Sequence, residues 1–398
     1  MYDKVERERT FAYNKRKKAV TVMSLLKDIY NEEFAEALLN RIKSAYPAFE
    51  RDKCRALMFQ EDWPGLTLKQ RMRRITDSLY ETLPKDYIRA LDVLYETAPR
   101  FSGLAGIIFP DYVQQYGTDH WDESMKALQY FTRFSTSEFA VRPYIRLGRE
   151  RMFKEFLSWT EHPDEHVRRL ASEGSRPRLP WGISIPALLE DPSPILPVLD
   201  RLMQDDSLYV RKSVANNLND ISKTHPDLLA QIAAERFGSC PHTDWILKHA
   251  CRTLLKRGDK QALAVFGFED ASRISLERFT LNSETAAIGT SIHFSFQIRS
   301  SARQKVRVEY AIDFVKKRGH RSRKVFKMSE SAMDNGDVKA FSKHHSLKDL
   351  TTRKHYRGIH TLSVIINGTV KGSLDFSVEF KNPSISQMEG CGAYSGLP

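Results

Sequence analysis

The sequence predicts a mainly α-helical protein, in which a stack of paired helices is followed by a smaller all-β domain. Three observations support this fold class. Apolar residues recur every three to four positions over most of residues 21–270, as they do in amphipathic helices. A weak internal repeat lies within that helical part. Near residue 275 the apolar period changes from about 3.6 to 2, which is typical of strands.

The composition is that of an ordinary globular protein. The chain has 398 residues, of which 41% are hydrophobic and 28% charged, and this length allows two or more domains. The formal net charge of +12 favours an anionic partner such as a nucleic acid. No apolar run reaches the roughly 18 residues of a membrane span, and the charged N-terminus lacks the apolar stretch of a signal peptide. We therefore expect a protein that does not enter membranes. The widely spaced cysteines make a reducing cytoplasm the expected location, and nothing in the sequence suggests more than a monomer.

The cysteines argue against a metal site. Cys54, Cys240, Cys251 and Cys391 are widely spaced and contain no Cys-x-x-Cys pair. This spacing argues against both a zinc site and a disulfide framework. The sequence predicts neither a metal nor another cofactor.

The helical domain is predicted over residues 21–272, after a basic arm at residues 1–20 that carries the run KRKK. The clearest amphipathic segments are residues 26–46, 68–83, 88–98 and 123–134. Residues 101–117 contain Gly and Pro and break this pattern, which predicts a short helical corner.

Three segments of this domain superpose without gaps: residues 162–174, 205–217 and 241–255. Val167, Val210 and Leu247 coincide, at offsets of 43 and 37 residues. These offsets are typical of HEAT-type helical pairs, which stack into an α-solenoid. Two basic positions follow the shared apolar one in each segment and predict a ladder of phosphate contacts. The ladder consists of Arg168, Arg169, Arg211, Lys212, Lys248 and His249.

The segment SLYVRKSVANNLNDISKTHPDLL predicts a helix with one narrow apolar face. That face consists of Val210, Val214, Leu218 and Ile221. Lys212, Asn216 and Asp220 are spaced four apart and form a polar strip along one flank, while Asn217 lies close to the apolar face. A solvated helix face with an i,i+4 polar network is the alternative interpretation of the strip.

Residues 273–382 are predicted to form an antiparallel β-sandwich of immunoglobulin type. The predicted strands are residues 291–298, 305–315, 323–329, 356–368 and 371–380. Two basic stretches, residues 316–324 and 353–355, are candidate DNA-binding loops through Arg318, Arg321 and Arg353; the alternative is a solubilising charge run. Residues 383–398 are predicted to be a disordered tail.

Acidic residues are anomalous on a surface that binds a phosphate backbone, because they repel it. The candidates are Glu138, Glu173 and Asp220, and Glu173 occupies the repeat position of Asn216. An Arg/Pro-rich stretch follows Glu173 and contains Arg176, Arg178 and Trp181. Trp181 lies outside any helical apolar stripe, as expected for an exposed stacking or wedge residue.

Each of these residues has a structural alternative. Glu173 has an i,i+4 ion pair with Arg169 as its alternative role. Glu138 is alternatively the acid at the start of a helix that Thr136 or Ser137 caps. For Asp220 the alternative is a bond to the start of the next helix, and for Trp181 it is filling the gap between repeats.

Several of these segments resemble the AlkC family of bacterial DNA glycosylases. The resemblance is carried by SEFAVRP, EGSRPRLPWG, LYVRKSVANNLNDISKTHPDL and WILKHACRTLLKRGD. LTLKQRMRRI, LPKDYIRALDVL and FSGLAGIIFPDYVQQYG are similar to the N-terminal half of that family. TTRKHYRGIHTLSVIING resembles the immunoglobulin-like domain that many members carry, so the resemblance spans roughly residues 22–380.

The resemblance implies a HEAT-like repeat enzyme of the AlkC/AlkD type that removes cationic alkylated bases from double-stranded DNA. The expected lesions are chiefly 3-methyladenine and 3-methylcytosine, removed without flipping the base into a pocket. Glu138, Glu173 and Asp220 match the family's active-site acids, Trp181 its active-site Trp, and Arg169 a neighbouring Arg.

The expected chemistry is consistent with these residue types. A base methylated on a ring nitrogen is already cationic and leaves without a general acid. Carboxylates would stabilise the oxocarbenium-like sugar and position water, as in glycoside hydrolysis. The further DNA-binding candidates are Arg176, Arg178, Asn216, Asn217 and Arg252.

No lysine is marked as a Schiff-base nucleophile, so we expect a monofunctional glycosylase that needs no protein partner. Two other classes of protein are alternative interpretations, because they would also have the basic ladder or the β-sandwich. One is a non-catalytic HEAT-repeat module that binds DNA or RNA, which would tolerate Asp220→Asn and Glu173→Gln. The other is a protein scaffold, which would bind DNA weakly and with little dependence on salt.

Overall fold

The computed structural model describes residues 26–350 and 353–380. The predicted arm at 1–20, the predicted tail at 383–398 and Cys391 lie outside these residues. The described chain forms two compact units. One runs up to Leu229 and includes Gly238–Ala250; the other contains Ala230–Phe237 and the described residues from Cys251 onward. The sequence predicts a domain boundary at residue 272, which is also where the chain changes from helices to strands. The position of this boundary stays a prediction.

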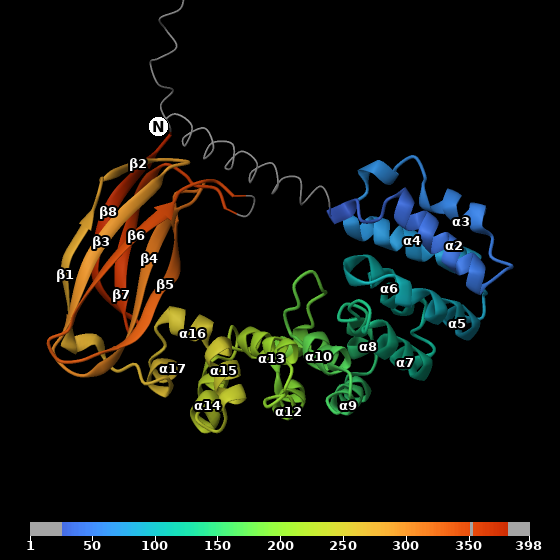
Figure 1. Cartoon of the computed structure of the whole chain (residues 1–398), viewed down its shortest axis with the longest axis horizontal. Helices are drawn as coiled ribbons and strands as arrows, with labels where there is room; N and C mark the ends of the chain where they lie inside the picture. Colours follow the sequence, from blue (N-terminus) through green and yellow to red (C-terminus); the bar gives the residue numbers. More distant parts are fainter. Residues whose placement is uncertain (1–25, 351–352, 381–398) are drawn as a thin grey trace, which may run out of the picture. The chain divides into compact units, whose positions relative to one another are not determined.

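The helices follow one another along the first two thirds of the chain (Figure 1). They are α2 (Glu32–Ala45), α3 (Arg51–Met58), α4 (Leu68–Thr82), α5 (Tyr87–Thr97), α6 (Ile108–Tyr116), α7 (Trp121–Phe131), α8 (Val141–Leu147), α9 (Arg149–Trp159), α10 (Glu165–Gly174), α11 (Pro186–Glu190), α12 (Leu196–Arg201), α13 (Leu208–Ile221), α14 (Pro226–Arg236), α15 (Pro241–Ala250), α16 (Arg252–Arg257) and α17 (Lys260–Val265). The predicted corner at 101–117 consists of a 3-10 turn, η3 (Gly103–Ile107), that leads into α6.

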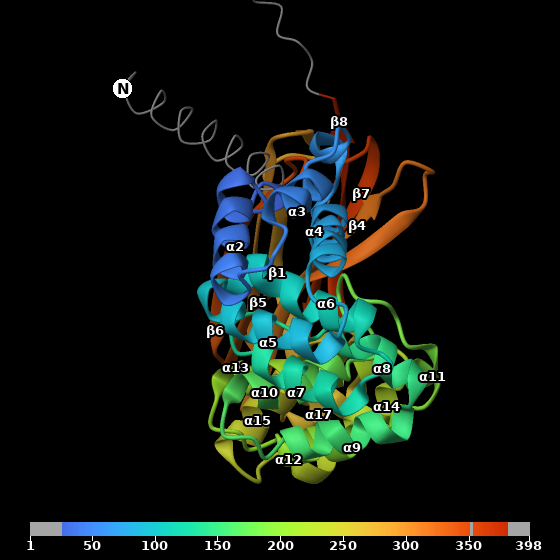
Figure 2. The same cartoon turned by 90° about the vertical axis from the view of Figure 1, so that its right-hand side faces the viewer.

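The repeat segments become neighbouring helices. Helix α10 packs on α13, and α13 packs on α15, so the repeated segments lie side by side (Figure 1). Helices α9 and α12 form a second row, contacting each other and α10 (Figure 2). Val167, Val210 and Leu247 are all fully buried in this stack. The stacking of helical repeats that the sequence predicts is therefore confirmed.

Equivalent residues also start two of these helices. The Asp164 side chain accepts a hydrogen bond from the His166 amide at the start of α10, and the Ser207 side chain accepts one from the Tyr209 amide at the start of α13. Side-chain oxygens at this position satisfy backbone donors that a helix leaves unpaired. The apolar face predicted for α13 is buried along its whole length.

The second unit holds two β-sheets. The strands are β1 (Ile274–Leu281), β2 (Thr285–Ala287), β3 (Ser291–Ser300), β4 (Gln304–Val315), β5 (Arg321–Met333), β6 (Val338–Ser346), β7 (Gly358–Ile366) and β8 (Thr369–Glu379). The sheets have the orders β1-β3-β6 and β2-β8-β7-β4-β5; β2 pairs with β8 in parallel and the other pairs are antiparallel.

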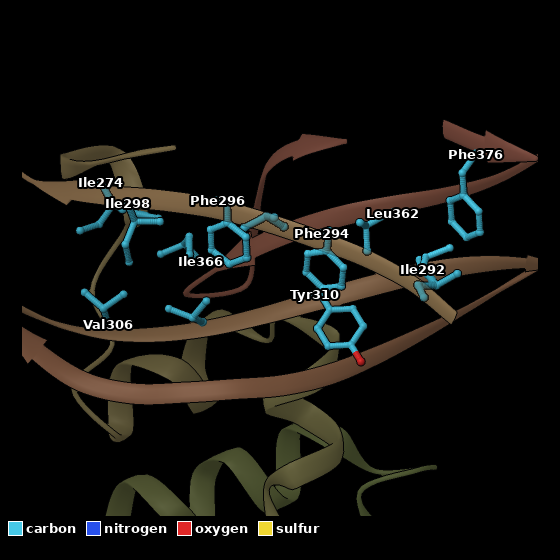
Figure 3. Close-up of a cluster of buried hydrophobic side chains, with 14 of the residues drawn as sticks. Ile274, Ile292, Phe294, Phe296, Ile298, Val306, Tyr310, Leu362, Ile366 and Phe376 are labelled. Carbon is cyan, nitrogen blue, oxygen red and sulfur yellow. The ribbon is translucent and has the colours of Figure 1, made fainter. Parts of the chain in front are cut away.

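The core of the sandwich lies between the two sheets (Figure 3). Every second residue of β3 from Ile292 to Ile298 is buried there, as the alternating pattern predicts. The predicted fold class, a helical solenoid followed by an immunoglobulin-like domain, is confirmed. Strand β6 was not predicted, because its sequence VKAFSKHHS is mostly polar; it pairs only with β3, at the edge of its sheet.

Two further properties concern the described residues alone. None of their helices is long and apolar enough to cross a bilayer. Within the same residues, no group of three or more His, Cys, Asp or Glu side chains is arranged to hold a metal ion. Cys54, Cys240 and Cys251 are free thiols.

Candidate active site

The three predicted acids lie in one continuous chain of alternating charges, here called the charge chain. Its members come from the turn before α8, from α10 and the loop after it, and from α13 and the turn after it. They are, in order of contact, Glu138, Arg169, Glu173, Arg176, Asp220 and Lys223. Three carboxylates and three cations give it no net charge.

At one end of the charge chain, Glu138 is 9% exposed and is held by two donors. Its Oε2 accepts hydrogen bonds from Thr136 Oγ1 at 2.7 Å and from Arg169 Nη1 at 2.9 Å. The Thr136 hydroxyl also accepts a hydrogen bond of 3.4 Å from the Glu138 backbone amide, so the predicted capping contact exists in the turn before α8, although α8 itself has no side-chain cap. Glu138 Oε1 has no partner among the residues that the structure describes, and so it remains available to a ligand or water.

The middle of the charge chain is the most deeply buried part. Arg176 Nη1 lies 2.5 Å from Glu173 Oε1, and its Nε and Nη2 lie 2.8 Å and 2.6 Å from Asp220 Oδ2. Glu173 is 5% and Asp220 2% exposed. Arg169 Nη2 is 3.8 Å from Glu173 Oε1, so the predicted i,i+4 pair exists but is longer than the contact with Arg176. Lys223 Nζ completes the set, 2.6 Å from Asp220 Oδ1.

The electrostatics keep the two arginines of the charge chain ionised. Burial opposes the charged form of Arg176, but the Glu173 and Asp220 carboxylates outweigh it and raise the pKa of Arg176 above its usual value. Burial likewise opposes the charge of Arg169, and the Glu173 and Glu138 carboxylates raise its pKa. Arg169 also stands over the half-exposed Tyr209 ring, 4.7 Å from the centroid. The acids are thus fixed in position by permanent cations.

Polar side chains of α13 complete the support of Glu173. Ser213 Oγ donates to Glu173 Oε2 at 2.6 Å, and Asn217 Nδ2 donates to the Ser172 carbonyl at 2.8 Å. Asn217 is fully buried, as its place beside the apolar face of the helix predicts. Its amide therefore joins α13 to α10 inside the protein, and its predicted role in DNA binding remains untested.

The loop between α10 and α11 is anchored by Arg142, which is fully buried. Arg142 Nη1 donates to the Gly174 carbonyl at 3.2 Å and to the Arg176 carbonyl at 2.8 Å, and its Nε donates to the Ile183 carbonyl. Burial, and then the neighbouring Arg146 and Arg176 charges, lower the pKa of Arg142 to about 10. One side chain therefore holds both ends of the segment that carries Arg176 and Trp181.

Trp181 projects from this loop. It is 61% exposed, so it does not fill the gap between repeats. Its φ of 64° lies in the left-handed region, which costs energy for any residue other than glycine. Lys69 of α4 donates a hydrogen bond to the Trp181 carbonyl, and the Gly182 amide donates to Leu179. The fold therefore holds an exposed aromatic side chain in a strained turn.

The predicted phosphate contacts differ in their surroundings. Arg168 forms a two-point ion pair with Asp205, with distances of 2.7 Å and 3.1 Å. Arg211 Nη1 donates to the Asp205 and Asp206 carbonyls at 2.6 Å and 2.9 Å. Both arginines thus fasten the segment that enters α13. Their role in DNA binding stays a prediction.

Lys212 and Arg178 are different, because both are exposed and neither has an ion-pair partner within residues 26–350 and 353–380. In α15, Trp245 and His249 stack with their ring centroids 5.2 Å apart. The structure leaves the DNA contacts predicted for Asn216, Lys248, His249 and Arg252 untested.

The two basic stretches of the second unit come together. The β4–β5 hairpin turns at Gly319 and carries Lys316, Lys317 and Arg318 at its tip, while Arg321 donates to Thr361 Oγ1 at 2.8 Å. The Arg353 guanidinium lies over Phe314 and Phe326, 5.4 Å and 5.9 Å from their centroids, on the strands that form this hairpin. Arg353 and Lys316 both lower the pKa of Lys324. The sequence predicted each stretch separately; the structure joins them into one cationic surface, here called the hairpin surface.

Sequence reasoning missed Arg142, Lys69, Ser213 and Lys223. A local signal existed for Lys223, which lies three positions after Asp220, in the turn that follows α13. Arg142 bonds residues 32 to 41 positions away, so its partners could not be read from spacing.

Comparison with known proteins gives a consistent picture. The family model described as “DNA alkylation repair enzyme” matches residues 53–254, and the one described as “Uncharacterised protein YhaZ, C-terminal Ig-like domain” matches residues 275–380. The chain is 62% identical over 356 residues to the “Uncharacterized protein YhaZ” of Bacillus subtilis, a match that covers 89% of this chain and 100% of that protein.

Among solved structures, the chain is similar to the Pseudomonas fluorescens alkylpurine DNA glycosylase AlkC, which was solved bound to DNA containing an abasic site analog. The TM-score is 0.86 and the sequence identity 39%, over 89% of this chain and 99% of that one.

Proposed function

Because the chain belongs to the DNA alkylation repair enzyme family, we propose that it is a monofunctional DNA glycosylase acting on cationic alkylated bases in duplex DNA. The proposed substrates are 3-methyladenine and 3-methylcytosine. The proposed reaction is hydrolysis of the N-glycosidic bond by a monomer in the bacterial cytoplasm.

The observation that carries this proposal is the charge chain. It holds three carboxylates, each at most 9% exposed, inside a protein with a net charge of +12, and the loop that carries its Arg176 also carries the exposed Trp181. Buried carboxylates cost free energy unless cations compensate them, and here every carboxylate touches one. Such an arrangement favours positive charge that develops on a nearby sugar.

The proposed reaction needs no general acid. The C1′–N bond breaks with both electrons passing to the base, so that a cationic base leaves as a neutral one. Water then bonds to C1′ through its oxygen, and its surplus proton passes to solvent or a carboxylate. Glu173 and Asp220 would stabilise the oxocarbenium-like sugar. Glu138, whose Oε1 is open within the described residues, would hold the attacking water.

DNA binding is proposed to use both units. Lys212 and Arg178 would contact phosphates near the charge chain, and the hairpin surface would contact DNA with Arg318 and Arg353. Trp181 would lie against the sugar or base at the lesion. We propose that the lesion is exposed to the acids by bending of the duplex rather than by flipping of the base.

The test is release of 3-methyladenine from methylated duplex DNA by the wild type, Asp220→Asn and Glu173→Gln. Glu161→Gln serves as the matched control, because Glu161 forms an exposed ion pair with Arg201 away from the charge chain. We expect the first two variants to release the base at least about 100-fold more slowly under single-turnover conditions, as when one electrostatic group is removed from an active site. The control should match the wild type.

Binding to duplex DNA that contains an abasic-site analogue shows whether the variants remain folded and bind DNA. If the wild type binds this DNA but releases no base, the chain is a DNA-binding module. The fully satisfied bonding of Glu173 and Asp220 is the observation that favours this second candidate, since such a network also serves structure alone.

A further inference from the structure

A cavity of about 170 Å³ lies behind Trp181 within the first unit. Its walls come from α4, from the η3–α6 segment, from residues 136–140 and from residues 181–183. Phe139 and Ala140 of the wall directly follow Glu138 in the chain. One turn of the backbone therefore serves both the charge chain and this cavity, although no part of the proposed reaction uses the cavity.

The size of the cavity limits its ligand. A cavity of about 150 Å³ holds one benzene molecule in a protein core. The space behind Trp181 is therefore suited to a small ring system.

The walls favour a flat aromatic molecule. Met72, Leu104 and Ile107 provide apolar surface, and two aromatic residues, Phe139 and Trp181, also line the cavity. Aromatic side chains bind nucleobases by stacking, whatever the identity of the base. The cavity thus combines the dimensions and the surface that a free heterocyclic base requires.

One polar side chain in the wall has no bond to satisfy it. Gln114 lines the cavity, and its amide forms no hydrogen bond with any part of the chain that the structure describes. An amide offers both a donor and an acceptor, which matches the paired groups at the edge of a nucleobase. The Tyr30 hydroxyl also lines the cavity, and it donates to the Leu104 carbonyl at 3.2 Å.

The charges in the wall do not favour a cation. Arg73 pairs with the buried Asp111 through two contacts, at 2.7 Å and 3.0 Å, so these two side chains together carry no net charge. Lys69 adds a further positive charge at the rim, where it lies 5.5 Å from the Phe139 centroid. A cationic alkylated base still attached to DNA would be repelled, whereas a neutral base would not.

We propose that this cavity is a product pocket that binds the neutral alkylated base after its release from DNA. The proposal rests on the proposed glycosylase function, because cleavage converts a cationic base into a neutral one. The pocket would accept the form of the base that the reaction produces and reject the form that precedes it. Trp181 and Lys69 form its rim, between the pocket and solvent.

The test uses the whole protein without DNA and free 3-methyladenine as the probe, with binding measured by calorimetry and by ligand-observed NMR. Gln114→Ala removes the open amide, and Gln115→Ala is the matched control on the neighbouring residue, which does not line the cavity. Met72→Trp fills the space. We expect wild type and Gln115→Ala to bind the base equally, Gln114→Ala to bind it about fivefold to tenfold more weakly, and Met72→Trp not to bind it.

Kinetics on alkylated duplex DNA separate this proposal from the proposed function. Free 3-methyladenine should inhibit the wild type but not Met72→Trp, while both release base at the same rate in a single turnover. Release of base by a wild type that does not bind the free base would refute the product pocket and leave the glycosylase intact. The product pocket would also be refuted if Met72→Trp and Gln114→Ala bound the free base as tightly as the wild type does. Binding without any base release would overturn both assignments.

Discussion

The Arg142 guanidinium donates a hydrogen bond of 2.8 Å to the backbone carbonyl of Arg176, the residue whose own side chain joins Glu173 to Asp220. A buried residue that touches neither acid thus sets where their shared cation lies. In this arrangement Arg142 is a positioning residue.

Arg142→Gln should therefore lower both stability and activity. Its loss leaves buried carbonyls without donors, at a cost of about 1–3 kcal/mol for each group that stays unpaired. Arg146→Gln is the control, since the exposed Arg146 makes a single bond of 3.2 Å to the Ser184 carbonyl. Thermal unfolding should show a clear loss for Arg142→Gln and little change for Arg146→Gln.

The positioning role needs a second measurement, because a structural defect alone would lower the melting temperature. Arg142→Lys keeps the charge and one donor group, so it should recover much of the stability but not the geometry of the loop. We expect its single-turnover rate of base release to stay below that of the wild type at temperatures where both are folded. Equal rates would limit Arg142 to a structural role.

Two substitutions of Trp181 distinguish the effect of backbone strain on stability from the effect of the aromatic ring on activity. At φ 64° glycine avoids the steric cost that any side chain incurs, so Trp181→Gly should be more stable than Trp181→Ala by about 1 kcal/mol. Both variants remove the exposed ring, and both should release alkylated base more slowly than the wild type. Urea unfolding and single-turnover assays check the two halves of this prediction. An Ala variant as stable as the Gly variant would mean that the turn carries no strain.

The basic residues of the first unit should fall into two groups: those that contact DNA phosphates and those that stabilise the fold. Lys212→Ala and Arg178→Ala should each reduce the slope of log affinity against log salt by about one, because each removes an exposed charge that would contact a phosphate. Arg211→Ala should leave the slope unchanged and lower stability, because Arg211 bonds the Asp205 and Asp206 carbonyls. Fluorescence anisotropy on duplex DNA at several salt concentrations measures these slopes. If Arg211→Ala also reduced the slope, Arg211 would contact a phosphate, as the sequence predicted.

The second unit should lose stability in mild acid through His345. Burial, followed by the Arg353 charge, lowers the pKa of His345 to about 4, whereas an unfolded histidine has a pKa of about 6.5. The folded state therefore favours neutral His345, whose Nδ1 lies 2.9 Å from the Tyr310 hydroxyl. This contribution is complete above about pH 6.5 and is lost as the pH falls towards 4, at about 1.4 kcal/mol per pH unit.

Unfolding followed as a function of pH checks this prediction. Arg353→Gln removes a cation that disfavours protonated His345, so the pH dependence between about 6.5 and 4 should become shallower in this variant. A pH dependence that Arg353→Gln does not alter would assign the acid sensitivity to other groups, such as His355 and His360, whose pKa values burial also lowers.

Prediction from the sequence succeeded for features that depend on a single helix or strand. The buried face of α13 and the alternation in β3 follow from periodicity within a single helix or strand. The partners of Arg176 were out of reach, since Asp220 lies 44 residues away and the two meet only when α10 packs on α13. The repeat correctly aligned Arg168 with Arg211. It could not show that both side chains bond the segment before α13, because Arg168 pairs with the Asp205 carboxylate, which lies 37 residues away, and Arg211 bonds backbone carbonyls.

The charge chain also constrains how this protein can evolve. Glu173, Arg176 and Asp220 neutralise one another in its buried middle, so replacing any one of these three leaves an unpaired charged neighbour, at a cost of several kcal/mol in the interior. A lineage that alters the site must then pass through unstable intermediates or change two positions at nearly the same time. These three residues are therefore expected to be inherited together, although they lie in two separate segments of the sequence.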